Sequence, residues 1–169
     1  IQDYQLNQGI RSGDFDEVWL FGFPYAGFYE SRMIGPGAFF CNSDPIITSE
    51  PTRRYVIMGF NYQRGVGEML ESFGHRVEFI MDRVYRNMPE SKNLFKRFSR
   101  YDKTTPGQAE VGSIHYAPNS QRDYDWGNTS LVWSRCDNWM KFPDLSGAPR
   151  QVTSSEWGNG DIRLHHVWY

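Results

Sequence analysis

The fold is decided by residues 54–87, which read RYVIMGFNYQRGVGEMLESFGHRVEFIMDRVYRN. The first seven are mostly apolar and rich in β-branched and aromatic side chains, which predicts a buried strand. From Arg64 to Asn87 apolar residues recur every three or four positions, which predicts an amphipathic helix that Pro89 ends. The apolar stripe expected to face the core consists of Val66, Leu70, Phe73, Val77, Ile80, Met81 and Val84.

The segments before residue 54 complete half of an α/β arrangement. Residues 1–12 predict a short helix ended by Gly13, and the apolar run at residues 18–23 predicts a strand buried on both faces. Residues 24–51 are rich in Gly, Pro and aromatic residues and predict a long ordered loop, a type of segment that is usually functional. We therefore expect an α/β fold with a mainly parallel or mixed central sheet flanked by helices, and with long ordered aromatic-rich loops.

The second half of the chain carries weaker signals. Ser91 is expected to cap a short helix through residues 94–98. Beyond Pro106 we expect a strand at residues 111–116, a polar loop at 118–128, a short strand at 132–133 and a closing apolar segment at 164–169. A length of 169 residues fits one domain, residues 1–169, either as a mature chain or as a processed or partial piece of a longer one.

Composition excludes several classes of protein. Eighteen Lys and Arg against twenty Asp and Glu give a net charge of −2, which leaves no basic surplus for a nucleic acid. No uninterrupted apolar stretch approaches the roughly 18 residues of a membrane-spanning helix. The 12 Phe, 6 Trp and 10 Tyr residues argue against disorder. A phosphate-binding loop, a dinucleotide-binding fingerprint and a Gly-x-Ser-x-Gly nucleophile motif are all absent from the sequence.

The polar face of the predicted long helix offers metal ligands. Glu71, His75 and Glu78 are spaced four and three residues apart, so they lie over one another opposite the apolar stripe. Zinc accepts imidazole nitrogen and carboxylate oxygen, and a catalytic zinc site has three protein ligands and a water molecule. The sequence therefore predicts that His75 and Glu78 bind one divalent metal ion, zinc, with Glu71 as a further ligand or a base. The third ligand would come from far away in the sequence, where the remaining histidines are His115, His165 and His166. The alternative is a solvated helix face whose acids pair with arginines.

His115 ends the expected strand at residues 111–116, where it could act as a metal ligand or a general base. Its alternative role is a strand-end hydrogen bond to the following loop. The other two histidines, His165 and His166, would point in opposite directions if residues 164–169 form a strand, so at most one could face a site.

Ligands of α/β proteins bind beyond the carboxyl ends of the strands, which here deliver residues 24–30 and 61–64. Glu30 stands among aromatic residues that would keep water from its carboxyl group, as suits a general acid. An ion pair of Glu30 with Arg32 or Arg53 is the alternative. The substrate-binding residues that we predict are Tyr25, Tyr29, Asn61, Arg64, Asn119 and Trp126.

Three further motifs each have two interpretations. Residues 123–128 (DYDWGN) place oxygen ligands at alternating positions, as calcium loops do, but lack the glycine and glutamate of an EF-hand and could be held by Asx turns. Cys41 and Cys136 predict one disulfide, or else two free buried thiols. The Asn-Thr-Ser triplet at residues 128–130 is a glycosylation sequon typical of secreted proteins, or a chance match.

Several long motifs resemble a family of secreted bacterial and fungal proteins. They are DEVWLFG (16–22), GFYES (27–31), VIMGFNYQRGVGE (56–68), HRVE (75–78), His115 with APN (117–119), and DYDW (123–126). The resemblance covers most of the chain and implies an exported protein. It also implies that six residues form one recurrent set: Glu30, Asn61, His75, Glu78, His115 and Asn119. This set favours a metal site over a merely solvated helix face, but the resemblance brings no reaction with it.

The function expected from these observations is a secreted metal-dependent hydrolase. His75, Glu78 and His115 would hold the ion, and Glu30 or Glu71 would act as acid or base on its bound water. The substrate would be an extracellular glycan or peptide. One alternative is a carbohydrate-binding or adhesion module whose aromatic residues stack on sugar rings, and another is a structural subunit whose rings form an interface.

Overall fold

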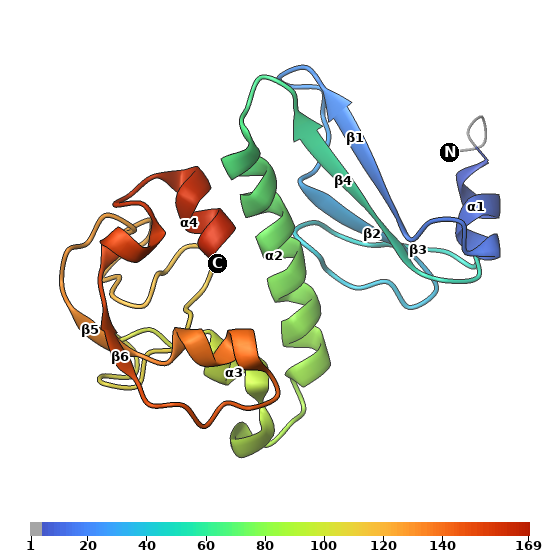
Figure 1. Cartoon of the computed structure of the whole chain (residues 1–169). Coiled ribbons are helices and arrows are strands. Elements are labelled where there is room, and N and C mark those ends of the chain that lie inside the picture. Colours follow the sequence, from blue (N-terminus) through green and yellow to red (C-terminus); the bar gives the residue numbers. More distant parts are fainter. Residues whose placement is uncertain (1–4) are drawn as a thin grey trace. The chain divides into compact units, whose positions relative to one another are not determined.

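The computed structural model describes residues 5–169, and the expected mixed α/β class is confirmed (Figure 1). The fold has a four-stranded mixed sheet in which most pairings are parallel, together with several helices. Within the chain two compact units can be distinguished, one up to Ile80 and one from Met81 onward. The single domain inferred from chain length stays a prediction.

The sheet of the first unit contains β1 (Glu17–Gly22), β2 (Ser31–Gly35), β3 (Ile46–Ile47) and β4 (Tyr55–Asn61), in the order β1-β4-β2-β3. Strands β1 and β4 are parallel, with Gly22 opposite Asn61, so both deliver their carboxyl ends to the same edge. Strand β2 is antiparallel to β4, and β3 is parallel to β2. The strands expected at 18–23 and 54–60 are confirmed. The segment expected as one long loop contains β2 and β3, which are too short to give a clear alternating pattern.

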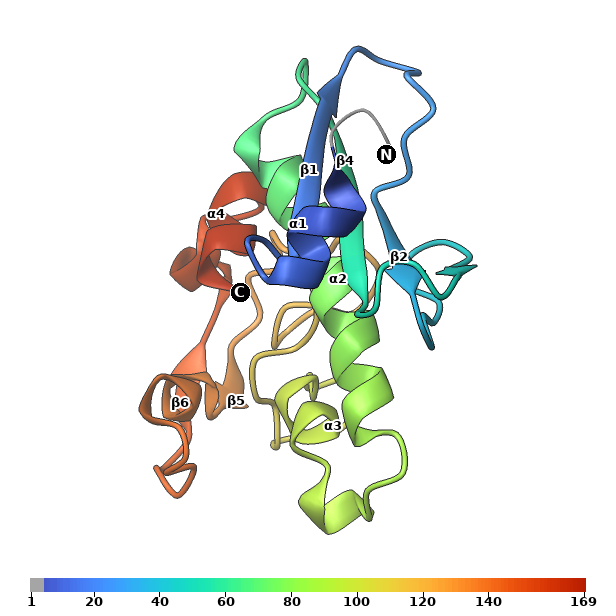
Figure 2. The same cartoon turned by 90° about the vertical axis from the view of Figure 1, so that its right-hand side faces the viewer.

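Helices α1 (Leu6–Ser12) and α2 (Val66–Tyr85) cover the two faces of this sheet (Figures 1 and 2). Alternate residues of β4 face opposite sides, as the pleat of a strand requires. Val56, Met58 and Phe60 pack with Met69 and Phe79 of α2. Tyr55 packs with Ile10 of α1. The end expected for the first helix is confirmed, since Gly13 caps α1 with a positive φ of 85°. The part of this helix expected at residues 1–4 lies outside the described residues.

Helix α2 does not bury the stripe that its sequence predicts. Val66, Phe73 and Val84 are 54%, 37% and 56% exposed. The residues buried along the helix are small ones, Gly67, Ser72 and Gly74. The position of Arg76 explains part of this difference, because its guanidinium lies 4.6 Å from the Phe73 ring centroid and pairs with Glu17 of β1. The charged end of this side chain thus lies between Phe73 of α2 and Glu17 of β1.

The expectation that the first strand is buried on both faces is wrong. Trp19 and Phe21 of β1 are 45% and 57% exposed. Among residues 5–169, strand β1 lies at the edge of the sheet and pairs with β4 alone, so its side chains have neighbouring strand residues on one side. Both rings still contact Phe60, with centroids 5.2 and 5.4 Å away.

The second unit is built from short elements around an aromatic core (Figure 1). After the end of α2 come η1 (Glu90–Lys92), α3 (Leu94–Phe98), β5 (Val132–Ser134), η2 (Cys136–Lys141), β6 (Arg150–Val152), η3 (Ser154–Trp157) and α4 (Ile162–Trp168). Strands β5 and β6 form an antiparallel pair. The buried core is centred on Trp126, Trp157 and Val152.

Three expectations for this unit need correction. Residues 111–116 form turns and one isolated bridge instead of a strand. The segment expected at 164–169 belongs to helix α4, whose first turn is capped by Asp161, which accepts the backbone N–H of Leu164. The apolar residues of this segment gave no sign of the cap. Asn93, not Ser91, caps α3, because its side chain accepts the backbone N–H of Lys96.

The predicted disulfide is wrong, since Cys41 and Cys136 are both buried free thiols. Cys41 lies against Ser31 in the core of the first unit, and Cys136 belongs to the core of the second. Among residues 5–169, none of the helices combines the length and apolar composition that crossing a membrane would require.

Candidate metal centre

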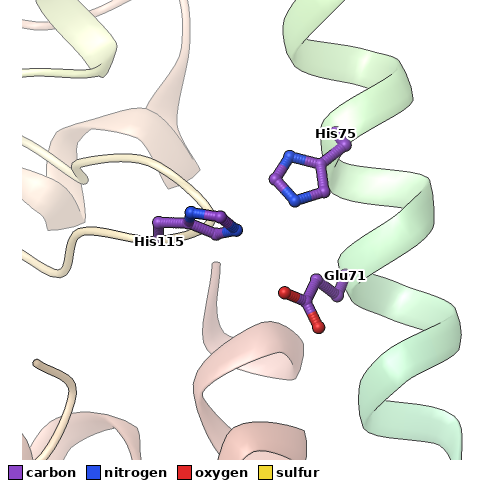
Figure 3. Close-up of side chains that lie close together, drawn as sticks. All are labelled: Glu71, His75 and His115. Carbon is purple, nitrogen blue, oxygen red and sulfur yellow. The ribbon is translucent and has the colours of Figure 1, made fainter. Parts of the chain in front are cut away.

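Helix α2 presents Glu71 and His75 on consecutive turns. Figure 3 shows the carboxylate and the imidazole projecting from the same side of the helix, as a spacing of four residues requires. Both residues are half-buried. Glu30 and Glu71 each act on His75 through their negative charge. The pair is thus a partly desolvated, electronegative surface of the first unit.

Glu78 lies beside the Nδ1 atom of the His75 ring. Its Oε2 atom is 3.6 Å from His75 Nδ1, and both side chains are 20% exposed. This distance is longer than a direct hydrogen bond but keeps the opposite charges close. The interaction with Glu78 raises the pKa of His75, although burial opposes the increase. Because the carboxylate of Glu78 lies on the Nδ1 side of the ring, Nε2 is the nitrogen left to bind a metal ion.

His115 is held in a similar way within the second unit. Its Nδ1 atom is 2.9 Å from Oδ1 of Asp123, and its ring lies 4.3 Å from the Tyr124 ring. The backbone N–H of Tyr124 also donates to the His115 carbonyl oxygen. A carboxylate on Nδ1 fixes the ring orientation and makes Nε2 the ligand atom. The DYDW motif thus supplies the carboxylate that contacts His115, a role that neither the calcium-loop nor the Asx-turn interpretation of this motif included.

Ligand atoms of Glu71, His75 and His115 lie within 4.8 Å of one another (Figure 3). The three side chains are half-buried. Two imidazoles and one carboxylate are the ligand set of many catalytic zinc sites. The carboxylate in this group is Glu71, which the sequence analysis gave as a further ligand or a base. Glu78 as a metal ligand stays a prediction.

Glu30 is exposed, contrary to the prediction that the aromatic loop would bury it. Its side chain accepts a hydrogen bond from Asn42. Neither predicted ion pair forms: Arg32 donates to the carbonyl oxygen of Asp44, and Arg53 pairs with Asp16.

The first unit contains a cavity of about 430 Å³ at the carboxyl ends of β1 and β4. Four of the catalytic and substrate-binding residues predicted from the sequence line this cavity, namely Tyr25, Glu30, Asn61 and Arg64. Tyr29 does not line it, and its ring instead packs under the guanidinium of Arg32 at 4.9 Å.

Asn119 and Trp126, the other predicted substrate-binding residues, are buried in the second unit. Asn119 is fully buried and donates to the carbonyl oxygens of Asn128 and Ser130, at 2.7 and 2.8 Å. Trp126 is 6% exposed and belongs to the aromatic core. These contacts hold the loop that carries Asp123.

The remaining polar motifs of this unit also have structural roles. The Asp125 carboxylate accepts hydrogen bonds from the backbone N–H of Gln121 and the side-chain amide of Asn128, both at 2.9 Å. These bonds agree with the interpretation of residues 123–128 as a loop held by Asx-type hydrogen bonds. His165 and His166 are both buried, since α4 is a helix and the strand alternation expected for them does not apply. The His165 ring stacks on Trp126 with centroids 4.9 Å apart.

No family model, curated protein or solved structure matches this chain.

Proposed function

We propose that this protein is a metal-dependent hydrolase in which Glu71, His75 and His115 bind one divalent ion, with zinc the best fit. The observation that supports the proposal is the group of three half-buried ligand atoms within 4.8 Å of one another. A His, His, Glu set leaves a fourth position for water on tetrahedral zinc. The ion lowers the pKa of that water toward about 7 and so supplies hydroxide at neutral pH.

Three carboxylates have supporting roles in this proposal. Glu78 and Asp123 orient the two imidazole rings through Nδ1. Glu30 is the acid or base, because it lines the neighbouring cavity and its charge acts on His75. Glu71 becomes a ligand, which removes it from the acid–base role. We also propose that the chain belongs to the secreted family that it resembles, that it is exported, and that its substrate is extracellular.

Metal binding is tested on the metal-stripped chain by elemental analysis and by titration with zinc. Wild type should bind one zinc ion per chain, and Glu71→Gln, His75→Ala and His115→Ala should each weaken binding at least a hundredfold. Asp82→Asn is the matched control, because it removes an exposed carboxylate of α2 that pairs with Arg86. Failure of wild type to bind zinc or any other divalent ion would overturn the proposal, as would unchanged affinity in the His115 variant.

Hydrolysis is tested separately with chromogenic esters, glycosides, peptides and phosphodiesters. Activity on one class should disappear with a chelator and return with zinc. If the protein binds zinc but hydrolyses none of these classes, the proposed metal site stands and the proposed hydrolase activity is wrong.

A further inference from the structure

The cavity of the first unit has the size of a small-molecule site. Its volume of about 430 Å³ lies within the range of about 300–1,000 Å³ that is typical of ligand pockets. It lies where the carboxyl ends of β1 and β4 meet the first turns of α2, and Met69 and Ser72 form its helical side. The fold places it at the sheet edge where α/β proteins bind ligands.

The lining combines two kinds of surface. Phe23, Phe28 and Phe60 supply aromatic rings, of which Phe23 is 62% and Phe28 49% exposed. Glu30, Asn61, Arg64 and Glu68 supply hydrogen-bonding groups of both polarities. Two carboxylates and one guanidinium give no positive excess, so the cavity is poorly suited to a phosphate or another anion.

The aromatic wall is held firmly by two glycines. A Cβ atom at Gly59 of β4 would lie 2.3 Å from the Phe28 Cβ, and one at Gly22 of β1 would lie 2.7 Å from Phe28 Cε2. The backbone N–H of Gly59 also donates to the carbonyl oxygen of Tyr29 at 3.0 Å. Phe28 therefore rests directly on the ends of β1 and β4, and its ring is preorganised.

The tip of the same loop is strained and fully exposed. Ala26 N–H donates to the Phe23 carbonyl oxygen at 3.2 Å, which closes a turn with Pro24 and Tyr25 at its centre. Tyr25 has a φ of 63°, a conformation that favours glycine, and its side chain is entirely exposed. Such strain costs on the order of 1–3 kcal/mol and is often found in ligand clamps. A bulky aromatic residue at this position has no packing role in the free protein.

We propose that this cavity binds one pyranose ring of a neutral saccharide. A pyranose has an apolar face of C–H groups that packs on aromatic rings, and its hydroxyl groups donate and accept hydrogen bonds around the edge. Phe23 and Phe28, with Tyr25 closing from the turn, receive the apolar face. Asn61, Arg64 and Glu68 bond the hydroxyl groups. This inference goes beyond the metal-dependent activity, since every residue that it uses belongs to the cavity.

The experiment measures saccharide binding by the intact chain without added metal. Cellobiose, maltose, xylobiose and chitobiose are compared with trialanine and inorganic phosphate by saturation-transfer NMR and calorimetry. We expect at least one disaccharide to bind, with saturation strongest on the C–H protons of one ring face. Phe28→Ala and Asn61→Ala should each weaken binding at least tenfold.

Two controls separate this result from loss of folding and from the metal site. Tyr62→Ala removes a neighbouring exposed ring that does not line the cavity, and it should bind the saccharide as wild type does. Glu71→Gln should also bind it normally, even if it no longer binds zinc. Absence of binding to every saccharide overturns the inference, as does binding of trialanine alone or equal affinity in wild type and Phe28→Ala.

Discussion

At the scale of single residues, the candidate centre depends on how two histidines are oriented. His75 and His115 each have a carboxylate beside Nδ1, Glu78 in one case and Asp123 in the other. An imidazole held in this way presents Nε2 in a fixed direction, which lowers the entropy lost when an ion binds. The carboxylates that hold the rings and the carboxylate that would bind the ion are therefore different groups, although Glu71 and Glu78 both neighbour His75 on one helix face.

Asp123→Asn should weaken zinc binding about 10–100-fold, because the amide orients His115 less firmly and does not increase the basicity of its ring. Titration of the metal-stripped chain measures this change. Asp144→Asn serves as the control, since that exposed carboxylate of the second unit accepts its hydrogen bonds from Ser146. Equal affinities in the two variants would show that Asp123 has no part in orienting a ligand.

Glu30→Gln should fold as wild type does, because the side chain is exposed and its hydrogen bond to Asn42 can be replaced by an amide. On a substrate identified by the hydrolysis screen, kcat should fall about 10²–10⁴-fold while zinc affinity stays unchanged. Full activity in this variant would show that Glu30 is not the acid or base and that its contact with Asn42 is structural.

At the scale of elements, close packing places the loop after β1 over the ends of the strands. Gly22 and Gly59 leave the space that Phe28 occupies, so two missing side chains determine the shape of the cavity. Helix α2 uses small buried residues in the same way, since Gly67, Ser72 and Gly74 are the residues it buries. Helix α4 instead buries two histidines beside Trp126.

Gly59→Ala should destabilise the protein by about 1–3 kcal/mol, because the new methyl group overlaps Phe28 and the Tyr29 carbonyl oxygen. Denaturant unfolding measures the change, and saccharide binding should weaken with it. In the matched variant Gly127→Ala the nearest contact is 3.6 Å, so its stability should differ by less than about 1 kcal/mol. A stable Gly59→Ala protein would mean that the loop moves aside at little cost.

Helix α4 should make stability depend on pH below neutrality. Burial, and to a smaller extent His166, lowers the pKa of His165 to about 3. In the unfolded chain His165 takes up a proton near pH 6.5, whereas in the folded chain it stays neutral until the pH is near 3. The contribution of His165 to the free energy of unfolding is therefore fully present above about pH 6.5 and is lost as the pH falls toward 3. Linkage predicts a loss of about 2 kcal/mol between pH 7 and pH 5.

Chemical unfolding at a series of pH values measures this dependence. His165→Phe keeps a ring against Trp126 and removes the titrating group, so its stability should change much less between pH 7 and pH 5. Identical pH profiles for wild type and His165→Phe would contradict the assignment.

At the scale of the whole molecule, both units are stabilised by packing and not by a covalent link. Cys41 and Cys136 are buried in the cores of different units as free thiols. Burial raises the pKa of both thiols, which keeps them protonated and slow to react at neutral pH. Each core must therefore be stable through its apolar contacts and hydrogen bonds.

Under denaturing, non-reducing conditions the whole chain should take up two alkyl groups from a thiol-specific reagent, as measured by intact mass. Under native conditions at neutral pH the same reagent should react slowly, because both thiols are buried. A denatured chain that takes up no alkyl group would contain the disulfide that the structure lacks.

The sequence by itself determined the elements whose signals are local. Unbroken apolar runs specified β1 and β4, and a long periodic segment specified α2, so the class of fold and the shared face of Glu71, His75 and Glu78 followed directly. Spacing along a helix fixes direction within one element, which is why the HRVE motif was informative.

Only the tertiary structure decided the features that join distant segments. It grouped Glu71 with His75 and His115, paired Asp123 with His115, placed Phe28 against two glycines and left both cysteines unpaired. It also turned residues 164–169 into a helix that buries two histidines. These outcomes depend on the packing of side chains far apart in the chain, and short-range periodicity carries no information about such contacts.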